Sequence, residues 1–142
     1  MNDKARYVFD TNVIISALLF GQSKPAQAFN AALDRGEILL SRPVLKELNE
    51  VLAREKFNPY LLLEERERFI IALLSESIFI DIKERIRACR DPTDDKFLEL
   101  AVNGGAGCII SGDEDLLILN PFQDIPIIKP YEFLSLLKTE NL

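Results

Sequence analysis

The chain lacks histidine altogether, and it has only two cysteines among its 142 residues. Histidine is the commonest general base near neutral pH and the commonest metal ligand among side chains, so imidazole chemistry is excluded. Cys89 and Cys108 lie far apart and belong to no C-x-x-C pair, which argues against a zinc knuckle or a redox pair. If the chain carries out chemistry, we expect carboxylates holding a divalent metal to perform it.

Long hydrophobic runs are missing too, so no segment is long enough to span a bilayer. The N-terminal stretch MNDKARYVFD is polar and acidic where an export signal would be apolar, and we expect a cytoplasmic protein. A content of 48% hydrophobic and 28% charged residues is typical of a globular domain. We predict one domain over residues 1–142, with a core from about 6 to 137.

Positive charge is also scarce, and the formal net charge is −6. This charge argues against a protein that wraps nucleic acid by bulk electrostatics, but it does not exclude an enzyme acting on nucleic acid. Two bound divalent cations would bring −6 to about −2.

Strand and helix patterns alternate along the chain, which favours an α/β fold with a parallel sheet covered on both faces. We expect strands over 6–10, 37–40, 78–82, 108–111 and 125–128. We expect helices over 13–19, 24–35, 41–54, 62–75, 91–104 and 131–137, and a helical turn near 116. No internal repeat is visible.

Asp10 and Asp113 directly follow the first and fourth predicted strands. In open α/β sheets the functional crevice lies outside the carboxyl ends of the strands. The simpler interpretation is that each acid caps the next helix. For Asp113 both interpretations stand, whereas at Asp10 the following Thr11 and Asn12 could supply the cap instead.

Glu47 lies at the border of an apolar helix face, about 100° from its centre at 100° per residue. The apolar face consists of Val44, Leu45, Leu48, Val51 and Leu52. Glu50 lies nearly opposite and is expected to face solvent. Glu47 can therefore turn inward, although it could equally be an ordinary flanking glutamate.

Asp94 precedes apolar residues at the spacing of one helix face. These residues are Phe97, Leu98 and Ala101. We expect Asp94 near the middle of the buried face, where a carboxylate is costly unless it is paired or bound to metal. Asp95 is expected at the periphery, from where it could join as a further ligand. The alternative is a capping box closed by Asp91 and Asp94, and capping is the role we expect for Asp91.

Three segments together resemble the PIN domain family, and more narrowly the VapC-like toxins of prokaryotic toxin-antitoxin systems. They are VFDTNVIISALL, RDPTDDKFLELA and IISGDEDLL, and the resemblance extends from about residue 6 to 137. It implies a three-layer α/β/α sandwich around a central, mostly parallel five-stranded sheet. It also implies a metal-dependent endoribonuclease.

The resemblance assigns four acids to the family's catalytic and metal-binding positions: Asp10, Glu47, Asp94 and Asp113. Asn12 and Ser111 match polar residues that support these acids, and Ser111 stands where the family often has threonine. The neighbouring Asp95 leaves the register open, and the helical-face argument favours Asp94. Whether Asp95 or Asp115 joins the site stays open.

The implied cofactor is Mg²⁺ or Mn²⁺, because hard cations held by carboxylates generate a nucleophile near neutral pH and neutralise developing charge. We hypothesise that Asp10 and Asp94 are the principal ligands and that Glu47 and Asp113 complete the site. The resemblance further implies an RNA substrate, a small cognate antitoxin, and a homodimer or higher oligomer.

Candidate contacts to RNA phosphates lie on two segments: Arg42 and Lys46 beside Glu47, and Arg87 and Arg90 within a basic run that also holds Lys83 and Arg85. For that run a solvated face is the simpler interpretation.

Four alternatives compete with this hypothesis: a receiver domain, a phosphatase, a binding module and a housekeeping nuclease. A receiver domain needs paired acids after the first strand and an aspartate after the third, but this chain has Asp-Thr-Asn and Ile-Asp-Ile there. A phosphatase with an aspartate nucleophile needs a second acid where Asn12 stands. A module that binds RNA or protein without cleavage, and a housekeeping RNA-processing nuclease, remain alternatives.

Overall fold

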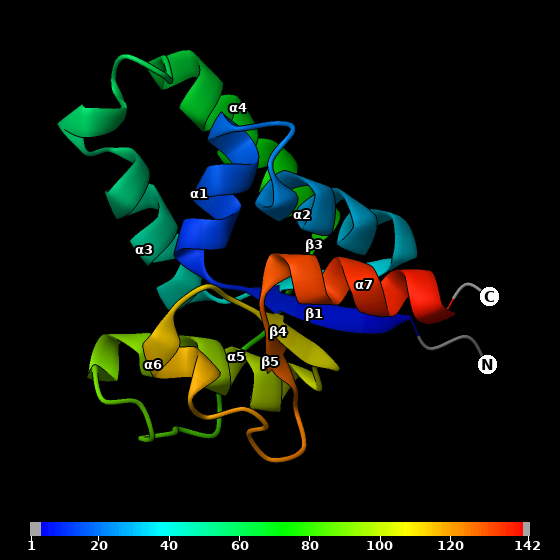
Figure 1. The fold of residues 1–142 in the computed structure, drawn as a ribbon. Coiled ribbons are helices and arrows are strands. Elements are labelled where there is room, and N and C mark those ends of the chain that lie inside the picture. The colour runs from blue at the N-terminus through cyan, green and yellow to red at the C-terminus, as the bar shows by residue number, and fades with distance from the viewer. Residues whose placement is uncertain (1–3, 141–142) are drawn as a thin grey trace.

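The computed structural model describes residues 4–140, which form a parallel sheet with helices on both faces (Figure 1). The strands are β1 (Ala5–Phe9), β2 (Gly36–Leu40), β3 (Ser77–Phe79), β4 (Cys108–Ile110) and β5 (Ile127–Ile128). Their order is β3-β2-β1-β4-β5, and every pairing is parallel. The predicted α/β/α sandwich with a five-stranded sheet is confirmed.

The helices alternate with the strands. They are α1 (Thr11–Leu19), α2 (Lys24–Arg35), α3 (Arg42–Leu52), α4 (Leu63–Glu76), α5 (Asp95–Gly104), α6 (Glu114–Leu117) and α7 (Pro130–Glu140), with short 3₁₀ helices η1 (Glu55–Phe57) and η2 (Pro92–Asp94). Figure 1 shows α1, α2 and α7 on one side of the sheet and α5 and α6 on the other. Among the described residues, no helix has the length and apolarity needed to cross a membrane.

The central strands are buried because both of their faces pack against helices, as their continuous apolar sequences predict. Val8, Ile38 and Ile109, from three neighbouring strands, are fully buried. Where β1 and β2 pair, only glycine fits at position 36, because a Cβ there would lie 2.2 Å from the carbonyl oxygen of Ala5. The sheet edge that carries the site therefore rests on a rigid core.

Three predicted strands are shorter than expected, β4 by one residue and β3 and β5 by two residues each. Gln123 and Asp124 have positive φ angles, and Phe122 bridges to Ile125, so residues 122–125 form a turn and β5 begins only at Ile127. Beyond β3, the chain leaves the sheet after the amide of Ile80 bonds to β2.

The segment 83–84 is then held by the side chain of Asn103 on α5, which accepts hydrogen bonds from the amides of Lys83 and Glu84. The segment 83–90 is therefore fixed by side chains rather than by strand pairing.

Candidate functional site

Asp10 and Asp113 lie side by side because β1 and β4 are neighbours in the sheet. Asp10 follows β1, and its amide donates to the carbonyl of Ile110 at the end of β4 (3.1 Å). Asp113 begins α6 and accepts from the amide of Asp115 (3.0 Å). The crevice position and the capping role therefore both hold for Asp113.

At Asp10 the expectation about the cap is wrong. Asp10 itself is the N-cap of α1, and its Oδ1 accepts from the amide of Val13 (2.8 Å). Thr11 already belongs to the helix, and its hydroxyl points elsewhere, to Glu47. Capping uses one carboxylate oxygen, which leaves Oδ2 of Asp10 for a second contact.

Ser111 links the two strand-end acids. Its hydroxyl is fully buried, donates to Oδ2 of Asp10 and accepts from the amide of Asp113 (2.9 Å). One side chain thus fixes both the orientation of Asp10 and the backbone that carries Asp113.

The carboxyl group of Asp10 is 4% exposed. Its pKa is raised to about 6, chiefly by burial and also by the negative charge of Asp113, against the lowering effect of the hydrogen bonds from Ser111 and Val13. Among the described residues, no ion pair to Asp10 is formed.

The expected burial of Asp94 is wrong, and the roles of the two adjacent acids are reversed in this respect. Asp95 is buried, whereas Asp94 is half-exposed. The reason is local: α5 begins at Asp95, and Asp94 ends the 3₁₀ helix η2, so a rotation of 100° per residue does not extend back to it.

Asp95 points away from the other acids. Its Oδ1 accepts from the amides of Ala88 (3.0 Å) and Cys89 (2.8 Å). Although burial raises the pKa of Asp95, these hydrogen bonds outweigh that effect and the pKa is lowered. Asp95 is thus an anchor for the preceding segment. Asp91 caps η2 as expected, through the amide of Thr93 (3.0 Å).

Asp94 instead faces the strand-end acids. The pKa of Asp94 is raised to about 6, and burial is the largest cause. The further causes, in decreasing order, are the charges of Asp113 and Asp91, a hydrogen bond with Asp113, and the charge of Glu47. Oxygens of Asp94, Asp113 and Asp115 all lie within 4.8 Å of one another and could hold a metal ion. Asp115, left open by the sequence, therefore lies in the cluster.

Glu47 is half-buried and Glu50 exposed, as the helix face predicts. The Oε2 of Glu47 accepts from the hydroxyl of Thr11 (2.9 Å) and from Nζ of Lys96 (3.1 Å). Glu47 is close enough to raise the pKa of Asp94, so it belongs to the same electrostatic cluster.

Thr11 and Lys96 are site neighbours that sequence analysis missed. Thr11 is buried, and the side chain of Lys96 is only 17% exposed. Each directly follows an acid discussed above, Asp10 and Asp95 respectively, which is the only sequence signal that could have drawn attention to them.

A cavity of about 910 Å³ opens over the strand-end acids. Asp10, Asn12, Asp113 and Asp115 line it, and its basic lining residues are Lys24, Arg90 and Lys129. Asn12 is exposed on the cavity wall. The cavity therefore combines carboxylates at the sheet edge with cations around them.

The four predicted phosphate contacts do not lie together. Arg42 and Lys46 are exposed on α3, and Arg87 lines a different cavity. Arg90 makes two hydrogen bonds to the carboxylate of Asp115 (3.0 and 2.7 Å).

The donor set fits a hard divalent cation. Carboxylate oxygens are the ligands that Mg²⁺ and Mn²⁺ prefer, and sulfur and imidazole ligands are missing from the Asp94, Asp113 and Asp115 cluster. Burial is the largest cause of the raised pKa values of Asp10 and Asp94, and the negative charge of Asp113 contributes to both.

The chain is similar to known proteins in both sequence and fold. The family model described as "PIN domain" matches residues 6–115. The uncharacterized protein MJ1680 of Methanocaldococcus jannaschii is 33% identical over 118 residues, which is 82% of this chain and 76% of that protein.

Two solved structures share the fold. One is a chain of VapBC2 from Rickettsia felis, bound to a DNA fragment from its promoter, with a TM-score of 0.56 and 17% identity over 87% of this chain and 97% of that one. The other is PAE2754 from Pyrobaculum aerophilum, with a TM-score of 0.62 and 13% identity over 94% and 90% of the two chains. The chain belongs to the PIN domain family, whose members are generally metal-dependent nucleases.

Proposed function

We propose that this chain is an endoribonuclease that hydrolyses phosphodiester bonds of RNA with Mg²⁺ or Mn²⁺ bound to its acidic cluster. The observation that carries this proposal is the convergence of Asp94, Asp113 and Asp115 within 4.8 Å, beside Asp10, at the carboxyl edge of the sheet. In a chain without histidine, these carboxylates are the groups available for such chemistry.

The residues that would hold the metal are Asp10, Asp94 and Asp113, with Glu47 and Asp115 beside them. A bound cation would supply a water acidic enough to attack near neutral pH and positive charge for the developing oxyanion. Asp95 is not among these residues, because its carboxylate is committed to backbone amides.

The remaining contacts position these carboxylates. The hydroxyl of Ser111 and the amide of Val13 orient Asp10, and the hydroxyl of Thr11 and the ammonium of Lys96 orient Glu47. Such supporting contacts keep ligand oxygens in place before the metal arrives. Arg90 donates a hydrogen bond to Asp115 and lines the cavity over the acids, where it can contact a substrate phosphate.

The test is a cleavage assay on total cellular RNA with Mg²⁺ or Mn²⁺. The wild type should cleave only with metal, Asp94→Asn should lose activity, and the matched control Asp34→Asn, an exposed aspartate on α2, should retain it. Full metal-dependent cleavage by Asp94→Asn would overturn the assignment.

We further propose that the chain is the toxin of a toxin-antitoxin pair in the cytoplasm, functioning as a homodimer or higher oligomer. This role is supported by the motif resemblance and by the fold shared with a chain of VapBC2. A small antitoxin covering the acidic cavity would silence it.

The partner proposal is tested by co-expression with the product of a short reading frame directly upstream. Loss of cleavage and co-purification with that product would support the toxin role. An isolated gene with undiminished cleavage would favour the housekeeping nuclease.

A further inference from the structure

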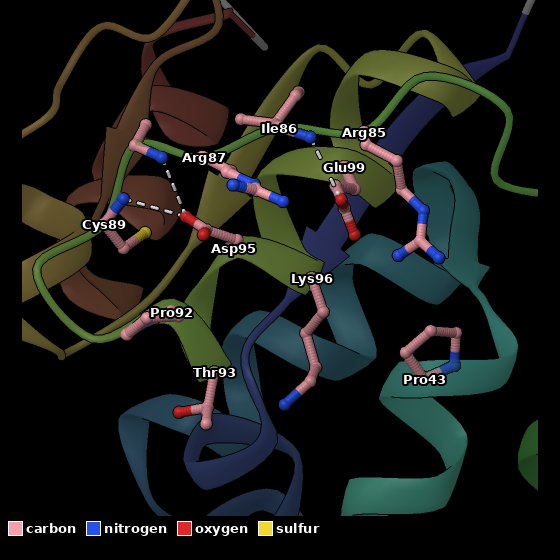
Figure 2. Close-up of a pocket in the computed structure, with 11 residues that line it drawn as sticks. Pro43, Arg85, Ile86, Arg87, Cys89, Pro92, Thr93, Asp95, Lys96 and Glu99 are labelled. Atoms are coloured by element: carbon pink, nitrogen blue, oxygen red, sulfur yellow. Dashed lines mark hydrogen bonds between the residues drawn. The ribbon is translucent and has the colours of Figure 1, made fainter.

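A second cavity, of about 920 Å³, lies apart from the acidic one (Figure 2). Its walls are the segment 85–89, the turn from η2 into α5, and Pro43 at the start of α3. We call it the basic groove, because Arg85, Arg87 and Lys96 line it.

The cations of the basic groove face open space. Figure 2 shows the nitrogen ends of Arg85 and Arg87 reaching into the groove from one irregular segment, with Lys96 entering from α5. Within residues 4–140, neither Arg85 nor Arg87 forms an ion pair or a side-chain hydrogen bond. Both guanidinium groups are therefore available to an anion.

The acids in the wall of the groove are directed at the backbone instead. Glu99 accepts from the amide of Ile86 (3.0 Å), and Asp95 accepts from the amides of Ala88 and Cys89. Both carboxylates are buried, at 7% and 8% exposure respectively. Neither carboxylate forms an ion pair with Arg85 or Arg87, although the charge of Arg87 contributes to lowering the pKa of Asp95.

These contacts also preorganise the arginines. The amide of residue 86 is held by Glu99, and those of residues 88 and 89 by Asp95, so the backbone on both sides of Arg87 is fixed. Arg85 lies between residue 86 and the amides bound by Asn103. A fixed backbone lowers the entropy lost when an anion binds.

The groove and the acidic cluster share one element. Thr93 and Asp95, which flank Asp94, both line the groove. Lys96 lines it too, and its Nζ lies 3.1 Å from Oε2 of Glu47. The groove and the acidic cluster are therefore neighbours across the start of α5.

We propose that the basic groove binds a backbone phosphate of single-stranded RNA on one side of the cleaved bond, with Arg85 and Arg87 as its ligands. Guanidinium groups bind phosphate oxygens through paired hydrogen bonds. Pro43 and Pro92 offer apolar surface to the ribose or base. This inference rests on the proposed ribonuclease function, because it takes the acidic cluster as the cleavage site.

The test measures binding of a labelled single-stranded RNA oligonucleotide in EDTA, so that cleavage cannot occur. The double variant Arg85→Ala/Arg87→Ala is compared with Arg54→Ala/Arg68→Ala, which removes two exposed arginines around η1 and α4. We expect the groove variant to bind about tenfold more weakly, with a salt slope smaller by about 0.7, since the loss of one single-strand phosphate contact lowers the slope by about that amount. The control should keep the wild-type slope.

A conservative variant separates charge from geometry. Arg85→Lys/Arg87→Lys keeps both charges but loses the paired hydrogen bonds, so its salt slope should match the wild type while its affinity falls. Melting temperatures of all variants verify that each is folded.

Several outcomes would overturn the groove assignment: no RNA binding by the wild type, equal losses in the groove and control variants, or loss of a protein partner instead of RNA. The outcomes for the two proposals are distinguishable. Wild type that binds RNA through Arg85 and Arg87 but never cleaves it supports the groove and refutes the nuclease. If the wild type cleaves RNA and the groove variants bind RNA as tightly as the wild type, the nuclease is supported and the groove is refuted.

Discussion

Replacing Asp10 by asparagine should stabilise the metal-free protein at neutral and alkaline pH. The carboxyl of Asp10 is buried, and burial raises its pKa from 3.8 to about 6. Between these values the folded chain binds more protons than the unfolded chain, so the free energy of unfolding falls as pH rises through about 6. Asparagine has nearly the same shape and no charge.

The gap between 3.8 and about 6 corresponds to at most about 3 kcal/mol. With an unfolding entropy of about 2.1 cal/mol/K per residue over 142 residues, that difference raises the Tm by about 10 °C. At pH 4, where the folded wild type is protonated, the advantage of Asp10→Asn should vanish.

The assay is thermal unfolding in EDTA at pH 8 and pH 4, with Asp34→Asn as the exposed control. Adding Mn²⁺ at pH 8 should raise the Tm of the wild type, since a ligand at 100 times its Kd stabilises by about 2.7 kcal/mol, and should raise that of Asp10→Asn much less. If Asp10→Asn is less stable than the wild type by the same amount at both pH values, the argument from buried charge is refuted.

Three further predictions concern the metal and the fold. Metal binding displaces protons from Asp10 and Asp94, whose pKa values lie at about 6. Below pH 6, the Mn²⁺ affinity measured by calorimetry should therefore fall by up to about tenfold per pH unit for each displaced proton. An affinity that is constant from pH 7 to 5 would contradict this. Ser111→Ala removes the hydroxyl that orients Asp10 and should weaken Mn²⁺ binding about 10- to 100-fold in the same titration, whereas unchanged affinity would show that the hydroxyl is dispensable. Gly36→Ala should lower stability by about 1–3 kcal/mol or more in denaturant unfolding, because its Cβ would lie 2.2 Å from a carbonyl of β1, whereas Gly107→Ala, with 3.8 Å to the nearest atom, should be tolerated; equal effects would argue against the close approach.

The positions of the strand-end acids could be predicted because they depend on local patterns and on one rule of parallel sheets. The apolar run before Asp10 forms β1, and the run before Asp113 forms β4. Parallel strands end at the same edge of a sheet, so Asp10 and Asp113 meet there. The hydrogen bond between Ser111 and Asp10, which are 101 residues apart in sequence, is formed at this edge. The inward turn of Glu47 followed from helix periodicity for the same reason.

Which of Asp94 and Asp95 is buried could not be predicted in the same way. A shift of one residue in the start of α5 changes which of the two acids is buried, and helix starts are decided by caps and 3₁₀ turns as much as by periodicity. Which backbone amides Asp95 meets depends on the path of residues 88 and 89, an irregular segment without a periodic pattern.

The ion pairs between side chains far apart in the sequence could not be predicted either. Lys96 reaches Glu47 across 49 residues, and Arg90 reaches Asp115 across 25. Whether a charged side chain meets a partner or faces open space, as Arg87 does, depends on how separately formed segments pack.

The sequence by itself therefore determined the α/β order of elements, the family, and the placement of Asp10 and Asp113 at strand ends, because each rests on short-range periodicity or on motifs within one segment. The tertiary structure alone decided that Asp95 rather than Asp94 is buried, that Asp115 joins the acidic cluster, and that Arg85 and Arg87 remain without ion-pair partners among the described residues. The physical reason is that burial and charge pairing depend on contacts between segments far apart in the chain, which no local pattern encodes.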